Sequence, residues 1–295
     1  MKRRGMVPGW PAAARLSGRG FARSLVLLAA VAALLLGSSG SAFAASQQAA
    51  RATTNFNVFA AASLLNAFPA MVKPFKATHK AFKNVKFNFN FQGTDVLVAQ
   101  IQQGAPADVF AGASTKYGDQ LFKAGLITTP SPFCQNKLIV ILPKSNPGNI
   151  HSLADLAVSG KKIAIGDANV PIGTYTRTVL KNLNATYGAT YSASVLANVV
   201  TTETNVTNVV TDVVLGEADA GFVYVTDAQY TLSKIKRLFI GQAYQSNPLP
   251  TYPIAVVKSS TNAALASQFT YFVLHARGQA ILKTWGFLPP PAPAK

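Results

Sequence analysis

The sequence is poor in residues that several classes of protein require. It has one cysteine, Cys134, which can form neither an internal disulfide nor a cysteine-rich zinc site. Only 13% of the residues are charged and 49% are hydrophobic, so the chain has enough apolar material to bury and is not a disordered polyampholyte. The apolar run over residues 25–36 is too short to span a bilayer comfortably, since about 20 residues are needed.

The first 44 residues contain basic side chains but no acidic ones. The basic segment is followed by the apolar run and then by the small residues Ser41-Ala42-Phe43-Ala44. This order is typical of a secretory signal with an A-x-A cleavage site. We therefore predict that residues 1–44 are a cleaved signal peptide, with an uncleaved anchor as the alternative. The basic residues of this segment are Lys2, Arg3, Arg4, Arg15, Arg19 and Arg23.

The positive charge of the predicted mature chain is smaller than that of the whole sequence. The formal net charge is +17, and without the six basic residues of the signal it is +11, from 21 basic and 10 acidic residues. Part of this charge falls in one cluster, which either attracts anions or forms a solvated helix face that leads into a strand. No nucleic-acid module accompanies the cluster, so no nucleic-acid partner is expected. The cluster comprises Lys73, Lys76, Lys80, Lys83 and Lys86.

Strand and helix patterns alternate along the mature chain. Short apolar or alternating segments predict strands, as in Phe87, Phe89 and Phe91, which alternate with polar residues. This alternation predicts an α/β fold with largely parallel strands, and the number of units favours two modest sheets over one large sheet. Strands are expected at 55–60, 85–91, 108–111, 138–142, 163–165, 195–201, 220–224 and 252–257, and helices at 64–81, 96–101, 116–124, 153–158, 174–183, 206–215 and 262–283.

Several predicted junctions between a strand and the next helix carry hydroxyl groups or small residues. In open α/β sheets ligands bind at the carboxyl ends of strands, where helix N-termini present free N–H groups. Helix N-termini and hydroxyl donors together can bind an anion without lysine or arginine. Any one junction is equally typical of ordinary helix capping. The junctions are residues 61–64, 93–95, 171–174 and 204–206, and Tyr224 ends a further strand.

Catalytic motifs are scarce in this sequence. The three histidines, His79, His151 and His275, are scattered and form no H-E-x-x-H pattern. A P-loop is absent, and Ser63 lies outside any G-x-S-x-G elbow. Cys134 has no nucleophile signature around it and is interpreted as an idle thiol. We therefore expect that the protein is not an enzyme, and a secreted serine hydrolase is the weaker alternative.

Five segments, taken together and in order, resemble the periplasmic molybdate-binding proteins of ABC transporters. The resemblance runs from about residue 55 to residue 288, which is nearly the whole mature chain. Its segments are residues 58–64 (VFAAASL), 100–110 (QIQQGAPADVF), 166–175 (GDANVPIGTY), 221–228 (GFVYVTDA) and 252–255 (YPIA).

This resemblance implies a class II periplasmic-binding-protein fold, with two α/β lobes and a ligand cleft between them. Lobe one is expected to comprise residues 53–136 and 251–295, and lobe two residues 137–250. The family holds a tetrahedral oxyanion with hydroxyl groups and main-chain amides. Carried over by motif, the expected ligand-binding residues are Ser63 and Thr94 as hydroxyl donors, Ile172 and Val206 as amide donors, and Tyr224 as the tyrosine hydroxyl.

The resemblance also implies the partners and the location. The ligand is expected to be molybdate or tungstate, with molybdenum present only as the oxyanion and no cofactor. Sulfate or another tetrahedral oxyanion is the alternative. The partner is expected to be an ABC transporter membrane permease, and the protein an exported monomer in the periplasm or at the outer face of the cytoplasmic membrane.

One residue departs from the family pattern. Asp95 follows Thr94 where the family commonly has another serine. A carboxylate beside a dianion is repulsive unless it points away or caps the helix. We favour the cap, and an altered ligand preference is the other interpretation.

Overall fold

The structure, a computed structural model, describes residues 53–241 and 247–292. The signal peptide predicted over residues 1–44 lies outside these ranges. Within them, none of the helices has both the length and the apolar character needed to cross a membrane.

The first sheet has the strand order β2-β1-β3-β10-β4. β1 pairs in parallel with β2 and β3, whereas β10 is antiparallel to both β3 and β4. We call this sheet with its covering helices lobe one. Its strands are β1 (Asn55–Ala61), β2 (Lys86–Gln92), β3 (Val109–Ala111), β4 (Ser131–Gln135) and β10 (Thr251–Val256).

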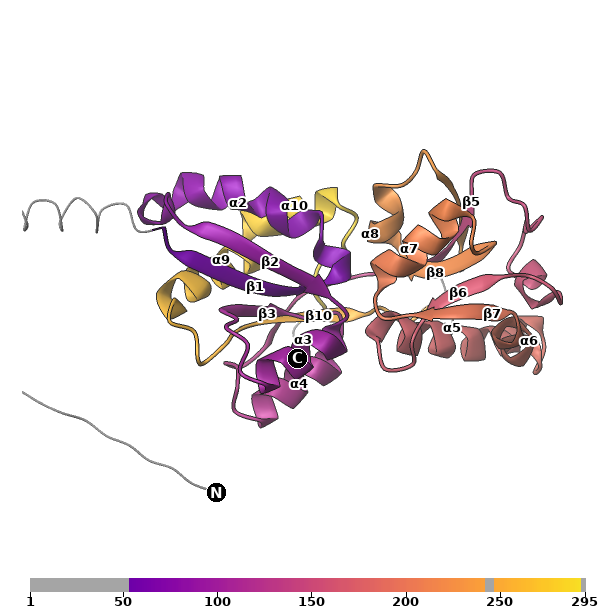
Figure 1. Cartoon of the computed structure of the whole chain (residues 1–295), viewed down its shortest axis with the longest axis horizontal. Helices are drawn as coiled ribbons and strands as arrows, with labels where there is room; N and C mark the ends of the chain where they lie inside the picture. The colour runs from indigo at the N-terminus through magenta and orange to yellow at the C-terminus, as the bar shows by residue number, and fades with distance from the viewer. Residues whose placement is uncertain (1–52, 242–246, 293–295) are drawn as a thin grey trace, which may run out of the picture. The chain divides into compact units, whose positions relative to one another are not determined.

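Helices cover both faces of the first sheet (Figure 1). One face is packed with phenylalanine, including Phe56, Phe68 and Phe269, whose rings meet edge to face. The other face packs Leu97 and Phe110 under a second pair of helices. The helices are η1 (Ala62–Leu64), α2 (Ala67–Thr78), η2 (Lys80–Phe82), α9 (Ala263–Leu274) and α10 (Ala276–Thr284), with α3 (Thr94–Gln102) and α4 (Thr115–Lys123) on the second face.

The second sheet has the order β7-β6-β8-β5-β9 and an almost wholly aliphatic core. β6 is parallel to β7 and β8, and β5 is antiparallel to β8 and β9. This sheet and its helices form lobe two. Its elements are β5 (Leu138–Pro143), η3 (Ala154–Ala157), β6 (Ile163–Gly166), α5 (Pro171–Tyr187), α6 (Tyr191–Ala197), β7 (Val199–Glu203), α7 (Val206–Leu215), β8 (Ala220–Tyr224), α8 (Val225–Gln229) and β9 (Ile235–Phe239).

The chain passes between the lobes twice, after β4 and after β9. The first strand after each passage, β5 and then β10, enters the interior of its sheet antiparallel to both neighbours. The expectation of two α/β lobes is confirmed. The expectation of largely parallel sheets is confirmed except for one strand in each, because four of the five strands run in the same direction. The exceptions, β5 and β10, arrive by a crossing between the lobes rather than by a helical crossover.

Three predicted elements differ from the structure. The strand expected at 195–201 is divided between the end of α6 and β7, since Val195 is buried on a helix. The helix expected at 262–283 is interrupted at His275, whose backbone is extended. The helix expected at 64–81 begins later, at Ala67, because η1 occupies the turn after β1.

Candidate binding site

A small pocket lies where the carboxyl ends of strands from both sheets face each other. Its empty volume is about 210 Å³, smaller than the roughly 300–1,000 Å³ of pockets for drug-sized ligands. None of its lining residues is charged. They are Ala61, Ala62, Ser63, Gln92, Gly93, Thr94, Ala113, Val170, Pro171, Ile172, Asn205, Val206 and Tyr224.

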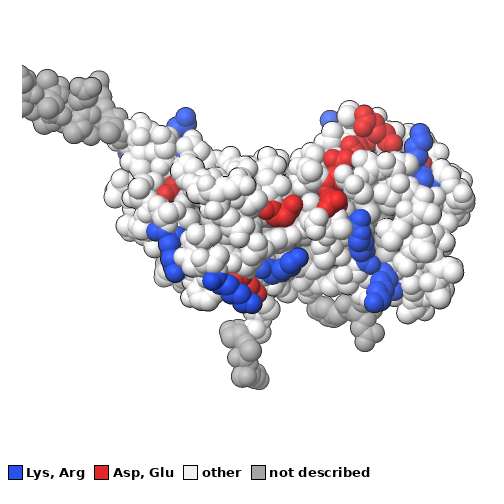
Figure 2. All heavy atoms as spheres, turned by 60° about the horizontal axis from the view of Figure 1, so that its bottom comes forward, with Lys and Arg blue, Asp and Glu red and all other residues white. Residues whose placement is uncertain are grey.

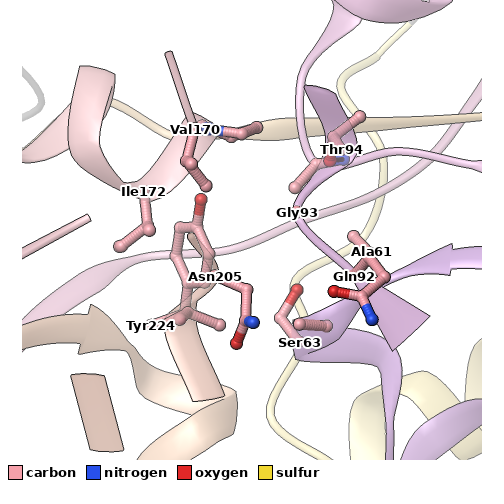
Figure 3. Close-up of a pocket in the computed structure, with 13 residues that line it drawn as sticks. Ala61, Ser63, Gln92, Gly93, Thr94, Val170, Ile172, Asn205 and Tyr224 are labelled. Atoms are coloured by element: carbon pink, nitrogen blue, oxygen red, sulfur yellow. Dashed lines mark hydrogen bonds between the residues drawn. The ribbon is translucent and has the colours of Figure 1, made fainter. Parts of the chain in front are cut away.

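All five residues expected from the sequence line this one pocket. Lobe one contributes Ser63 and Thr94, and lobe two contributes Ile172, Val206 and Tyr224. Figure 3 shows the two groups facing each other, with the Tyr224 hydroxyl pointing into the space between them. The lobes also touch here, since Ala62 packs into the hydrophobic core of lobe two. The fold therefore gathers residues that are up to 161 positions apart, Ser63 and Tyr224.

Thr94 begins α3, directly after the turn that follows β2. Its side chain is buried, and its Oγ1 accepts a hydrogen bond from the Ala113 N–H at 3.1 Å. A hydroxyl has one proton to donate. Because the bond from Ala113 uses an acceptor site of Thr94, the proton stays available to a ligand in the pocket.

Ser63 lies in η1, directly after β1, and is also buried. Its Oγ lies 2.9 Å from the hydroxyl oxygen of Tyr252, a residue of β10. Ser63 is therefore hydrogen-bonded to a residue of lobe one and faces lobe two across the pocket (Figure 3).

Tyr224 ends β8, and its buried hydroxyl has no hydrogen-bond partner among the residues that the structure describes. Leaving a buried polar group unsatisfied costs about 1–3 kcal/mol, so a ligand that accepts a hydrogen bond would relieve this cost. Burial raises the pKa of Tyr224 well above its usual value, and nearby Tyr252 adds to the effect. The hydroxyl is therefore a neutral donor at physiological pH.

The start of α5 is packed tightly against the end of β6. A Cβ on Gly173 would lie 1.9 Å from the Asp167 carbonyl oxygen and 2.3 Å from that of Gly166. Arg177 braces this approach by donating from Nη1 to the carbonyl oxygens of Gly166 and Gly173, both at 3.0 Å. The first N–H groups of a helix have no acceptor within it. The first turn of α5, which includes Ile172, therefore lies at the pocket on a closely packed backbone.

The start of α7 has a conventional side-chain cap. Asn205 accepts the Asn208 N–H at 3.1 Å and lines the pocket beside Val206. This cap satisfies one first-turn N–H group of α7, while that of Val206 belongs to the groups without an intrahelical acceptor. Lobe two thus brings two helix N-termini to the pocket, and their partial positive charges favour an anion.

Asp95 is not the cap that we favoured. The N-cap of α3 is Gly93, which has no side chain. The Asp95 carboxylate does not line the pocket, and its buried Oδ1 has no partner and lies against Gly93. Burial raises the pKa of Asp95; the N–H groups of Asp95 and Val96 oppose that rise and Asp167 adds to it. The carboxylate therefore belongs neither to the helix cap nor to the lining of the pocket.

Sequence reasoning missed Gln92 and Ala113 as lining residues. Gln92 is the last residue of β2, and Ala113 follows β3 by two positions. The carboxyl-end rule would have indicated both, since each follows a strand of the same sheet. Their side chains carry no motif that separates them from ordinary strand ends.

The lysine cluster lies away from this pocket. β2 begins at Lys86 and ends at Gln92, and a strand rises about 3.3 Å per residue, so the cluster is at the opposite end of the strand. Lys76 donates to the Val85 carbonyl oxygen at 2.5 Å, and its ammonium lies 5.8 Å from the centre of the Phe87 ring. Most of the surface in Figure 2 is uncharged, and acidic side chains gather near the middle of that face.

The described residues include a second, larger cavity of about 790 Å³ and no group of three or more metal-ligating side chains. None of the five expected residues lines this cavity. Its lining is dominated by proline: Thr115, Asp119, Pro130, Pro132, Tyr175, Leu249, Thr251, Pro253 and Pro291.

Comparison with known proteins gives a consistent result. The sequence profile of the family described as bacterial extracellular solute-binding protein matches residues 56–288. The chain is 35% identical to the molybdate-binding protein ModA of Mycobacterium tuberculosis over 268 residues, which are 90% of this chain and 96% of that protein.

Two solved structures show the same fold. The periplasmic molybdate-binding protein of Azotobacter vinelandii matches with a TM-score of 0.68 at 22% identity, over 80% of this chain and 100% of that one. The sulfate-binding protein SubI of Mycobacterium tuberculosis matches with a TM-score of 0.69 at 17% identity, over 81% of this chain and 88% of that one. The fold is thus shared by proteins whose names give different oxyanions.

Proposed function

Since the chain belongs to the family of bacterial extracellular solute-binding proteins, we propose that it binds molybdate or tungstate in the pocket between its lobes and delivers the anion to the membrane permease of an ABC transporter. Ser63, Thr94 and Tyr224 donate hydroxyl protons to the anion, and Ile172 and Val206 donate main-chain N–H protons.

One observation carries this proposal: the pocket offers many neutral donors and no charged side chain. The hydroxyl of Tyr224 is buried without a partner, and that of Thr94 already accepts a bond from Ala113. Two helix N-termini, of α5 and α7, add N–H groups and a favourable field. Such a site stabilises a small dianion that accepts hydrogen bonds from several directions.

The donor set also supports discrimination among oxyanions. Hydrogenphosphate carries a proton that needs an acceptor, whereas the main-chain N–H groups of Ile172 and Val206 can only donate. Sulfate is smaller than molybdate, so a donor shell fixed by two lobes leaves some of its hydrogen bonds long and unmade. Molybdate and tungstate are nearly equal in size, and we assign the site to both.

The two-lobed architecture supports a mechanism in which the anion is bound and released without a chemical reaction. We divide the chain into lobe one, residues 53–136 and 251–295, and lobe two, residues 137–250. The lobes close on the anion by a hinge motion at the two crossings, and the permease recognises the closed form. The protein acts as an exported monomer, in the periplasm or at the outer face of the cytoplasmic membrane, with no cofactor and no catalytic step.

The test is calorimetric titration of the mature chain with sodium molybdate, tungstate, sulfate and phosphate. We expect tight binding of molybdate and tungstate, weak binding of sulfate and none of phosphate. Tight sulfate binding without a molybdate response would refute the assignment and favour the sulfate alternative. A Ser63-dependent hydrolysis of model esters would instead indicate a hydrolase.

A further inference from the structure

A chain of buried side chains runs from Ser63 to both crossings between the lobes. The Tyr252 hydroxyl lies 2.9 Å from the Ser63 Oγ and 3.3 Å from the Asn136 Nδ2, which also lies 2.9 Å from the Thr226 Oγ1. All four side chains are buried. Asn136 stands between β4 and β5, and Tyr252 is the second residue of β10, so the chain of side chains lies where the polypeptide leaves lobe one and where it returns.

Asn136 donates to two hydroxyl groups of this network, those of Tyr252 and Thr226. Its Oδ1 accepts the Lys137 N–H at 2.9 Å, which assigns Nδ2 to the side of Tyr252 and Thr226. An amide nitrogen only donates, so the Tyr252 oxygen accepts from Asn136, whereas either hydroxyl can be the donor between Tyr252 and Ser63. Burial raises the pKa of Tyr252 well above its usual value, so the hydroxyl keeps its proton.

We propose that Tyr252 donates its hydroxyl proton to Ser63 and is thereby a positioning residue, which makes Ser63 a dedicated donor to a fully deprotonated oxyanion. A serine hydroxyl without a partner rotates, and can present either its proton or a lone pair. Because Ser63 accepts from Tyr252, its proton rather than a lone pair faces the pocket. The site thereby favours anions that only accept hydrogen bonds over anions that must also donate one.

This inference rests on the proposed function for the identity of the ligand, and it deepens that function by naming a residue that selects the protonation state of the anion. Tyr252 itself does not line the pocket. It acts through Ser63, so its contribution disappears when the Ser63 hydroxyl is absent.

The decisive experiment is a double-mutant cycle with Ser63→Ala and Tyr252→Phe, measured by calorimetric titration with sodium molybdate. Tyr252→Phe removes one oxygen and keeps the ring, which meets Phe133, Tyr224 and Phe287 edge to face. We expect losses of affinity of about 10–100-fold for Ser63→Ala and about 5–10-fold for Tyr252→Phe. The double variant should bind no more weakly than Ser63→Ala alone.

Independent losses that multiply in the double variant would overturn the positioning role, as would unchanged affinity in Tyr252→Phe. A second readout is anion choice: Tyr252→Phe should narrow the preference for molybdate over hydrogenphosphate, because Ser63 can then turn and accept. An unchanged preference would contradict the proposal. A purely structural role of Tyr252 would leave this ratio unaltered.

Two further variants serve as a control and as a substitute for Tyr252→Phe. Tyr191→Phe removes another buried hydroxyl, which donates to the Leu153 carbonyl oxygen at 2.7 Å in lobe two, and should bind as the wild type does. Asn136→Ala removes the donor to Tyr252 and replaces Tyr252→Phe if that variant does not fold. Its smaller loss of molybdate affinity should also vanish when Ser63 is already alanine. If the wild-type protein does not bind molybdate, the proposed function is contradicted. The double-mutant cycle would then be measured with the oxyanion that the wild-type protein does bind.

Discussion

The two lobes have the same strand order and orientation but bring different polar groups to the pocket. Lobe one presents the side chains of Ser63 and Thr94, each directly after a strand. Lobe two presents mainly backbone, at the starts of α5 and α7, together with the Tyr224 hydroxyl. The difference teaches that equivalent positions in one topology can supply donors either through a side chain or through the placement of the main chain.

Removing both hydroxyls of lobe one should have the largest effect. A hydrogen bond to a charged group contributes about 1.5–3 kcal/mol, so Ser63→Ala with Thr94→Ala should weaken molybdate binding by about 10²–10⁴-fold. The measurement is calorimetric titration. The matched control is Val206→Ile in lobe two, which keeps the main-chain N–H and should alter affinity by less than about threefold. Equal losses in both variants would remove the contrast between the lobes.

Lobe two should be vulnerable through its backbone packing instead. In Gly173→Ala the new Cβ would meet the Asp167 carbonyl oxygen at 1.9 Å, so α5 must shift away from β6. We expect the free energy of unfolding to fall by about 1–3 kcal/mol, and molybdate affinity to fall with it. Urea denaturation and titration measure the two effects. Gly241→Ala is the control, because a Cβ there meets no atom of the described residues within 4 Å. An equally stable Gly173→Ala protein would show that the close packing is not required.

Tyr224→Phe should separate stability from binding. The hydroxyl is buried without a partner in the free protein, and removing an unsatisfied group is neutral or stabilising by about 1 kcal/mol. The same variant loses a donor to the anion, so affinity should fall about tenfold or more. Thermal unfolding and titration should therefore move in opposite directions. A parallel loss of both would mean that the hydroxyl has an internal partner.

A pH dependence of stability should arise in lobe two. Burial raises the pKa of Asp227 to about 8, although the Tyr224 N–H donates to its Oδ2 at 3.0 Å. The folded state holds this proton more tightly than the unfolded state, so the stability from it is complete below about pH 4 and declines as pH rises toward 8. Asp227→Asn should flatten the melting temperature between pH 5 and pH 8. Asp119→Asn, on the exposed side of α4, should keep the wild-type slope.

The sequence was most informative about binding residues whose expected donor is a side-chain hydroxyl. Ser63, Thr94 and Tyr224 could be predicted as hydroxyls after strands, and they line one pocket. The roles of Ile172 and Val206 as main-chain donors came only from the resemblance, because a main-chain N–H group does not depend on which side chain the residue carries. Tyr252 was visible as part of a motif, but its contact with Ser63 joins residues 189 positions apart and depends on the tertiary fold.

The fold was predictable as far as local pattern reaches. Alternation indicated the strands around Phe87 and the two-sheet architecture. It did not indicate the antiparallel direction of β5 and β10, since direction depends on where the chain crosses between sheets rather than on periodicity. It also extended a helix through His275, because the helical pattern continues on both sides of one extended residue.

The place of β10 in the first sheet has a consequence for the order of folding. β10 is an interior strand, between β3 and β4, yet it is synthesised after every other strand of the described residues. All strands of the second sheet lie within residues 138–239, so lobe two can fold during synthesis while β3 and β4 still lack the strand that joins them. A nascent chain that has not reached Thr251 also lacks Tyr252, whose hydroxyl contacts Ser63. The Tyr252 contact of Ser63 can therefore form only after β10 has been synthesised.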